Sequence, residues 1–364
     1  MKTEHFRRQV NLACQGLITW NNNALELAHY FIPQGNLLLS HLRRYAYSFG
    51  ESQQGQECRA GAYLLYLLPF LKAFGATDQR IEEYSTVSIS LMPGARNFLD
   101  RASQTAIPYF LISSGYRPFV QSLGYLLGFQ ESEIYYTPLD LDHFSIDESE
   151  KETLKDLADE IVKMPLPAQE EAHPPTEILS EHIPYYQRLK IIFEEEIASM
   201  QIGDIMTRAP ALWGDEKVKA VIDSLEKTGN SAQNILYLGC SVLDAAALTW
   251  VREAGGMAVS FNGDQTAIRS AEVAVRSGSC AILAVLCDTF SRQGKEGIVE
   301  LVKTWDIHKI QTEKLKIDPS LINELFSHEP ESFPQLELVT SSNLERLIGD
   351  PTAAAAGWTL GERH

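Results

Sequence analysis

Three apolar segments, each followed by a glycine, constrain the fold of this chain more than any other feature. They cover residues 9–14, 108–112 and 234–238, and they precede Gly16, Gly115 and Gly239. Segments with helical patterns separate them. Short apolar runs that alternate with helices are typical of buried strands in a parallel sheet that has helices on both faces. The sequence therefore predicts an α/β fold built on a doubly wound parallel sheet.

Further patterns supply the remaining elements of this sheet. Strands are predicted at 134–138, 257–261 and 271–275, and helices at 95–102, 216–227 and 244–254. We expect a tight turn at 113–115, directly after the second strand, because Ser-Ser-Gly is a turn-forming sequence.

Two helical regions interrupt the predicted core, which is assigned to residues 1–23, 86–140 and 207–290. Residues 24–85 are predicted to form a helical cap, in which 62–74 is apolar on all sides, as expected of a buried helix. Residues 141–206 are predicted to form a second, largely helical insertion. It opens on a capping-box pattern and contains an irregular, proline-rich connector at 164–177. The role of residues 291–364 is left open.

The charge of the chain excludes several classes of partner. There are 31 basic and 48 acidic residues, a formal net charge of -17, so neither nucleic acid nor an anionic membrane is an expected partner. The longest apolar run, 62–71, contains Pro69 and is about half as long as a membrane span. No signal sequence is recognisable after Arg7 and Arg8, and we expect a cytoplasmic protein.

Cysteines and histidines form no recognisable framework. The five cysteines are widely spaced and odd in number, and the nine histidines include no pair at the spacing of a helical metal site. Neither disulfides nor a zinc site is predicted.

The candidate site lies where the predicted strands end. In doubly wound sheets, ligands bind outside the carboxyl ends of the strands. Those ends are residues 13–16, 113–115 and 239–244, and Lys217 begins the helix before the third of them. We expect these segments to meet at one edge of the sheet.

The order of these segments resembles the haloacid dehalogenase (HAD) superfamily of phosphatases. A closer likeness is to the archaeal family named for subunit R of energy-converting hydrogenase A. The likeness covers about residues 8–290, and the phrases that carry it are NALEL at 23–27, IP at 32–33, LPFLK at 68–72 and EAGGMAVSFNG at 253–263. The resemblance implies a HAD-like, Rossmann-type core beneath a helical cap.

The chemistry of that superfamily needs particular residue types. A carboxylate at the end of the first strand attacks phosphorus, and another, two residues on and on the same side of the strand, is the general acid and base. A Ser or Thr and a Lys hold the phosphoryl group. One or two Asp residues after the fourth strand complete a Mg²⁺ site.

The resemblance places unsuitable residues at three of these positions. Ala13 stands at the nucleophile and cannot attack phosphorus. Gln15 stands at the acid/base position and cannot exchange a proton. Cys240 replaces a metal ligand, and sulfur is poorly matched to Mg²⁺. The retained positions are the anion-binding residues Ser113, Ser114 and Lys217, and the metal ligand Asp244.

The remaining carboxylate and cation suggest how such a pocket could be neutral. A direct Lys217–Asp244 pair would balance the charge without any metal. Cys14 alternates with the two site positions around it, so its side chain should point into the packing of the sheet. Cys240 lies near a helix N-terminus, which lowers a thiol pKa. No histidine is placed to serve as its base, so we interpret it as a small buried filler.

Three hypotheses for function follow from these residues. The first is a catalytically silent, pseudophosphatase-like protein that binds a partner or assists an archaeal energy-metabolism assembly, without a cofactor. The second is a hydrolase of altered chemistry that uses Cys240 or a substrate-assisted route beneath the helical cap. Mg²⁺ would be needed only if phosphatase activity is retained. The third is a sensor of a phosphorylated small molecule held by Ser113 and Lys217.

Overall fold

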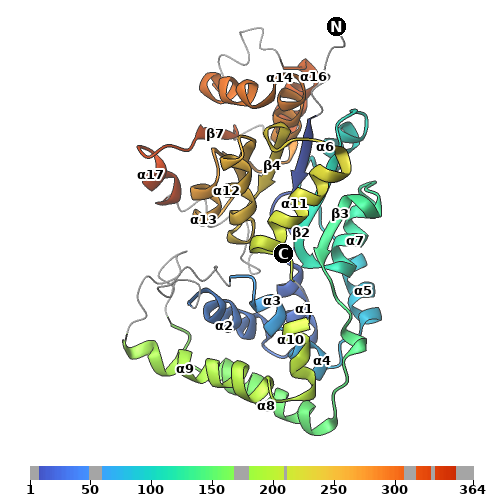
Figure 1. The fold of residues 1–364 in the computed structure, drawn as a ribbon, viewed down its shortest axis with the longest axis vertical. Coiled ribbons are helices and arrows are strands. Elements are labelled where there is room, and N and C mark those ends of the chain that lie inside the picture. The colour runs from blue at the N-terminus through green and yellow to red at the C-terminus, as the bar shows by residue number, and fades with distance from the viewer. Residues whose placement is uncertain are drawn as a thin grey trace.

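The protein is described by a computed structural model that covers residues 8–48, 60–167, 180–208, 211–306, 317–328 and 333–349. A seven-stranded sheet in the order β3-β2-β1-β4-β5-β6-β7 forms its centre (Figure 1). The strands are β1 (Gln9–Leu12), β2 (Tyr109–Tyr116), β3 (Ile134–Thr137), β4 (Ile235–Gly239), β5 (Met257–Phe261), β6 (Val273–Arg276) and β7 (Gln335–Leu338).

The first six strands run parallel, which confirms the predicted fold class. In register, Val10 of β1 lies opposite Tyr109 of β2 and Leu236 of β4. The seventh strand, β7, pairs antiparallel with β6. The C-terminal residues, whose role the sequence left open, therefore supply an edge strand of the sheet.

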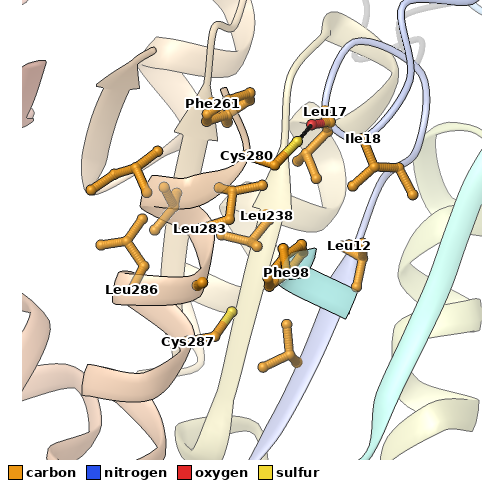
Figure 2. Packing of buried hydrophobic residues seen from close by; sticks show 14 of the residues in the cluster. Leu12, Leu17, Ile18, Phe98, Leu238, Phe261, Cys280, Leu283, Leu286 and Cys287 are labelled. Atoms are coloured by element: carbon orange, nitrogen blue, oxygen red, sulfur yellow. Dashed lines mark hydrogen bonds between the residues drawn. The ribbon is translucent and has the colours of Figure 1, made fainter. Parts of the chain in front are cut away.

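Helices cover both faces of the sheet because successive side chains of each strand point to opposite faces. One face carries Val10, Leu12 and Leu238, and Figure 2 shows Leu12 and Leu238 packed with Phe98 and Leu283. The helices on this face are α6 (Ala95–Ser103), α7 (Arg117–Leu126), α14 (Ala281–Thr304) and α16 (Pro319–His328). The helices on the other face are α11 (Gly214–Thr228), α12 (Ala245–Glu253) and α13 (Gln265–Ser270), and α17 (Leu344–Gly349) packs beside α13.

A polar network lies under the central strand on the second face. Gln9 and Asn11 of β1 are completely buried, and both donate to the Oγ of Ser224 on α11, at 2.7 and 2.8 Å. Thr228 donates to the Oε1 of Gln9 at 2.6 Å. Buried polar groups are tolerated when they are hydrogen-bonded, so this network fixes α11 against β1.

A layer of helices lies beyond one end of the sheet (Figure 1). Its residues come from two separate stretches of chain, yet they share one apolar cluster that includes Leu42, Phe70, Leu154 and Phe193. We call this the helical layer. It consists of α1 (Asn23–Phe31), α2 (Gly35–Ser48), α3 (Tyr63–Tyr66), α4 (Leu68–Ala73), α8 (Glu148–Lys163), α9 (Ile183–Ile191), the π-helical turn Ile192–Ile197 and α10 (Ile205–Arg208). The helix α5 (Asp78–Val87) packs mainly against α7.

Two sequence-based expectations about local structure are wrong. The segment 62–74 is two helices, because Pro69, in the first turn of α4, has no N–H for a continuous helix. The predicted turn at 113–115 is instead part of β2, which continues to Tyr116 with a register shift against β3. Gly115 makes this continuation possible, since a Cβ there would lie 2.2 Å from the Nε2 of Gln15.

The phrase Phe261-Asn262-Gly263 closes β5 in a strained turn. Asn262 has a φ of 47°, a left-handed conformation that Asn adopts more readily than most residues. Its side-chain amide holds the turn by donating to the carbonyl of Ser277 at 2.8 Å and accepting from the N–H of Ser277 at 3.0 Å. At Gly263 a Cβ would lie 2.0 Å from the Oγ of Ser260 and 3.0 Å from the Cβ of Ala267, so a larger residue would require these side chains to move.

Within the described parts of the chain, no helix has both the length and the apolarity that crossing a bilayer requires.

Candidate functional site

A small cavity lies between the carboxyl ends of β1, β2 and β4 and the helical layer. Its volume is about 30 Å³, room for roughly two water molecules. Its lining residues are Ala13, Cys14, Gln15, Asn22, Ala24, Tyr63, Leu64, Ser113, Ser114, Gly115, Lys217, Ser241, Leu243 and Asp244. The candidate residues of the three strand ends thus meet at one place, as their positions in the sequence led us to expect, and Cys240 is buried beside them.

Ala13 and Gln15 both have structural contacts here. The N–H of Ala13 donates to the carbonyl of Leu238, which continues the pairing of β1 with β4. The Oε1 of Gln15 accepts the N–H of Asn23 at 2.9 Å, at the start of α1. Gln15 therefore links the sheet to the helical layer through its amide, while its Nε2 lies against Gly115.

The hydroxyl groups of Ser113 and Ser114 both hydrogen-bond within the protein. The Oγ of Ser113 accepts the N–H of Gly115 at 3.1 Å and the thiol of Cys14 at 2.9 Å. The Oγ of Ser114 donates to the carbonyl of Leu212 at 2.5 Å. Cys14 is completely buried in the core, as predicted, but its thiol does not point away from the site, because it lines the cavity and bonds Ser113. Burial raises the pKa of this thiol to about 12.

Lys217 and Asp244 form a direct ion pair, which is one of the two arrangements that the sequence left open. The Nζ of Lys217 lies 2.5 Å from the Oδ1 of Asp244, and the two side chains are only 2% and 1% exposed. Burial pushes the pKa of Asp244 upward, but Lys217 and two backbone N–H groups outweigh this effect and hold the pKa below its usual range. The carboxylate is therefore ionised, and its charge is balanced by the lysine.

Both oxygens of Asp244 are surrounded by donors from the protein. The Oδ1 accepts from Lys217 and from the hydroxyl of Tyr237, the latter at 3.1 Å. The Oδ2 accepts the N–H groups of Cys240 and Ser241 at 2.9 and 3.1 Å and the hydroxyl of Ser241 at 3.3 Å. Five donors fill the lone-pair directions of one carboxylate, which has about four such sites.

This arrangement does not fit the Mg²⁺ ion that the family resemblance would imply. Mg²⁺ needs several oxygen ligands in octahedral array, but the one carboxylate at the cavity already accepts protein hydrogen bonds on both oxygens. In the portion of the chain that the structure describes, no group of three or more His, Cys, Asp or Glu residues could hold a metal ion.

Cys240 differs in one respect from the sequence-based expectation. Burial, and then the nearby charge of Asp244, raises the pKa of its thiol well above the usual value, so the expected lowering by a helix N-terminus is wrong. The backbone N–H of Cys240 at this helix terminus donates to the carboxylate of Asp244. The thiol itself donates to the carbonyl of Gln15 at 2.9 Å. A protonated, hydrogen-bonded thiol agrees with the interpretation of Cys240 as a buried filler.

Four further residues around the cavity were missed from the sequence. Tyr237 is completely buried, and burial raises the pKa of its phenol well above 10, which keeps it a donor to Asp244. Tyr237 lies two residues before Gly239, so the two residues are on the same face of β4. This spacing could have identified Tyr237 as a residue near the site. Asn22, which caps the N-terminus of α1, and Tyr63 of α3 line the cavity from the side of the helical layer. Asp264 accepts the N–H of Val242 at 2.6 Å, beside the site, and burial raises its pKa to about 6.

Comparison with known proteins finds the same fold in a solved structure. No protein-family model matches the chain, and no curated protein does so either. Among solved structures, the gene product AF1437 from Archaeoglobus fulgidus superposes with a TM-score of 0.73 at 20% identity, covering 94% of each chain. The chain shares the fold of that archaeal protein.

Other solved structures overlap only in part. A substrate-bound phosphoserine phosphatase has a TM-score of 0.45 at 9% identity, covering 78% of this chain and 99% of its own. A HAD family hydrolase from Salmonella enterica has a TM-score of 0.43 at 11% identity, covering 72% of this chain and 65% of its own.

Proposed function

We propose that this chain is a phosphatase-like protein of the HAD superfamily that has lost phosphoryl transfer and acts as a binding or accessory protein. The buried ion pair between Lys217 and Asp244 is the observation that carries the proposal. In a working site of this type, the lysine would hold a phosphoryl group and the aspartate a metal ion. In this chain the lysine and the aspartate pair with each other instead.

The residues at the other catalytic positions support the same conclusion. Ala13 presents a methyl group where a nucleophile would be needed. Gln15 uses its Oε1 on the N–H of Asn23, and an amide has no proton to exchange at neutral pH. Cys240 is buried and protonated, so it offers neither a nucleophile nor a metal ligand.

The altered-chemistry hydrolase has no observation in its favour among the described residues. Its best nucleophile was Cys240, whose thiol pKa is raised rather than lowered. The sensor of a phosphorylated molecule needs Lys217 to leave Asp244, which would strand a buried carboxylate. Breaking a buried pair in this way costs about 3–5 kcal/mol, which weighs against a phosphate ligand.

A phosphatase assay tests the proposal. The purified protein is incubated with a panel of phosphomonoesters and Mg²⁺, beside Lys217→Met and an exposed control, Lys163→Met. We expect no turnover above that of the buffer in any of the three. Mg²⁺-dependent turnover that persists in Lys163→Met and disappears in Lys217→Met would overturn the proposal.

A further inference from the structure

The cavity has no net charge, although it lies where a phosphatase-like fold would bind a dianion. Lys217 and Asp244 cancel one another at 2.5 Å, and no other ionisable carboxylate or basic side chain is among its lining residues. Burying a charged ligand in an uncharged site is costly, because the ligand loses its hydration and gains no counter-charge. An uncharged group that can accept hydrogen bonds meets no such penalty.

Asn22 supplies a buried donor with no partner. The residue lines the cavity and is 5% exposed. Its Oδ1 accepts the N–H of Leu25 at 3.4 Å and the guanidinium of Arg43 at 3.2 Å, which fixes the orientation of the amide. Its Nδ2 has no hydrogen-bond partner within the described chain. A buried donor left unpaired costs free energy, which a ligand oxygen would restore.

Gln15 supplies a second donor to the same cavity. Its Oε1 is occupied by the N–H of Asn23, so its amide orientation is also fixed and Nε2 is left as the donor. No hydrogen bond of Nε2 to any described residue is present, and the group lies beside Gly115, where the missing side chain leaves space. Two amide groups that line one cavity with N–H donors left over are suited to a ligand that carries an acceptor, such as a carbonyl oxygen.

The rest of the lining is apolar. Ala13, Ala24, Leu64 and Leu243 surround the cavity together with the ring of Tyr63. Their hydrocarbon surface suits the carbon atoms of a ligand, and the small volume restricts it to one functional group. We propose, building on the binding function inferred above, that the cavity binds an uncharged carbonyl group of the carboxamide class, with Asn22 and Gln15 donating to its oxygen.

Acetamide and acetate are a matched pair of probes, since they have the same size and shape and differ in charge. The side-chain N–H pair of Asn22 is identified in the NMR spectrum by its absence from Asn22→Asp. We expect acetamide to shift this pair saturably, with a dissociation constant on the order of millimolar for so small a ligand. Acetate should bind at least tenfold more weakly, and inorganic phosphate should leave the pair unmoved.

The control variant is Asn36→Asp, which makes the same chemical change at an exposed position of α2. Because Asn22→Asp lacks this N–H pair, acetamide binding to both variants is measured by saturation transfer from the protein to the acetamide methyl group. The transfer should be retained in Asn36→Asp and lost in Asn22→Asp, each checked for folding by circular dichroism. The comparison of the three probes on the unmodified protein does not depend on either variant.

Two results would overturn this inference. One is binding of acetate or phosphate as tight as that of acetamide, and the other is an Asn22 pair that acetamide never shifts. Neither result restores phosphoryl transfer, so the proposed loss of catalysis would stand. Turnover dependent on Lys217 would instead remove that proposal while leaving the probe measurements as they are.

Discussion

Asp244 organises the site at the scale of single residues. It accepts hydrogen bonds from the side chains of Lys217, Tyr237 and Ser241 and from two backbone N–H groups, which also cap the turn before α12. One carboxylate therefore holds α11, β4 and α12 together. The residue that the family resemblance marks as a metal ligand has a structural role in this chain.

Removing only one partner of this pair should be strongly destabilising. We expect Lys217→Met to lower the free energy of unfolding by about 3–5 kcal/mol, because Asp244 would remain buried without a counter-charge. The double variant Lys217→Met, Asp244→Asn should recover much of that loss, since the asparagine oxygen can still accept the N–H groups of Cys240 and Ser241. Urea unfolding at neutral pH measures both, and equal losses in the two variants would show that charge is not the cause.

Asp264 should make the stability of the protein depend on pH in the opposite direction to that of most carboxylates. Burial raises its pKa to about 6, so the folded protein binds this proton more tightly than the unfolded chain does. Between the ordinary pKa of Asp, about 4, and about 6, the folded state holds the extra proton, and the contribution to stability falls as the pH rises. It is fully present below that window and lost above it.

The comparison of the protein with Asp264→Asn isolates this contribution. The free energy of unfolding is measured from about pH 4 to about pH 7, the window set by the two pKa values. We expect the protein to lose stability relative to Asp264→Asn over this range. A constant difference between the two would mean that Asp264 titrates normally.

At the scale of elements, the contact between sheet and helical layer depends on close packing at a few points. The hydroxyl of Tyr116, at the end of β2, donates to the carbonyl of Leu64 in α3 at 2.5 Å. The ring of Trp213, just before α11, lies directly on Gly61. Asn21 joins the segment before α1 to the segment after α5. Its side-chain amide donates to the carbonyl of Ser88 and accepts the N–H of Ser90, at 2.7 Å each.

Gly61→Ala should disturb this contact. A Cβ at position 61 would lie 2.1–2.4 Å from three atoms of the Trp213 ring, so the ring must move. We expect a loss of about 1–3 kcal/mol, as for other overpacked sites, and a change in tryptophan fluorescence. Gly349→Ala is the control, because nothing lies within 4 Å of a Cβ there. Unchanged stability and fluorescence in Gly61→Ala would contradict the described packing.

The elements of the sheet could be predicted from sequence because their signals are local. Short apolar runs such as those of β1, β4 and β5 identified the strands, and glycines marked their ends. The continuation of β2 could not be predicted, because Ser-Ser-Gly also favours a turn. What decides between the two is a distant contact, the amide of Gln15 over Gly115.

At the scale of the whole molecule, the chain consists of a sheet with helices on both faces and a helical layer beyond its carboxyl end (Figure 1). The meeting of the strand ends could be predicted, because parallel strands place their ends at one edge. That two distant stretches of helix share one apolar cluster could not, since an apolar pattern does not say which faces meet. The same holds for Asn22, which reaches the cavity from the side of the helical layer.

The central claim is that the cavity is neutralised by its own ion pair and holds no divalent cation. Mn²⁺, a paramagnetic substitute for Mg²⁺, tests it most directly through its broadening of the Asn22 side-chain N–H pair. We predict that the signals of this pair stay sharp when one equivalent of Mn²⁺ is added, while the signals of residues near acidic surface groups broaden only weakly. Saturable broadening of the Asn22 pair by less than one equivalent, reversed by EDTA, would contradict the account.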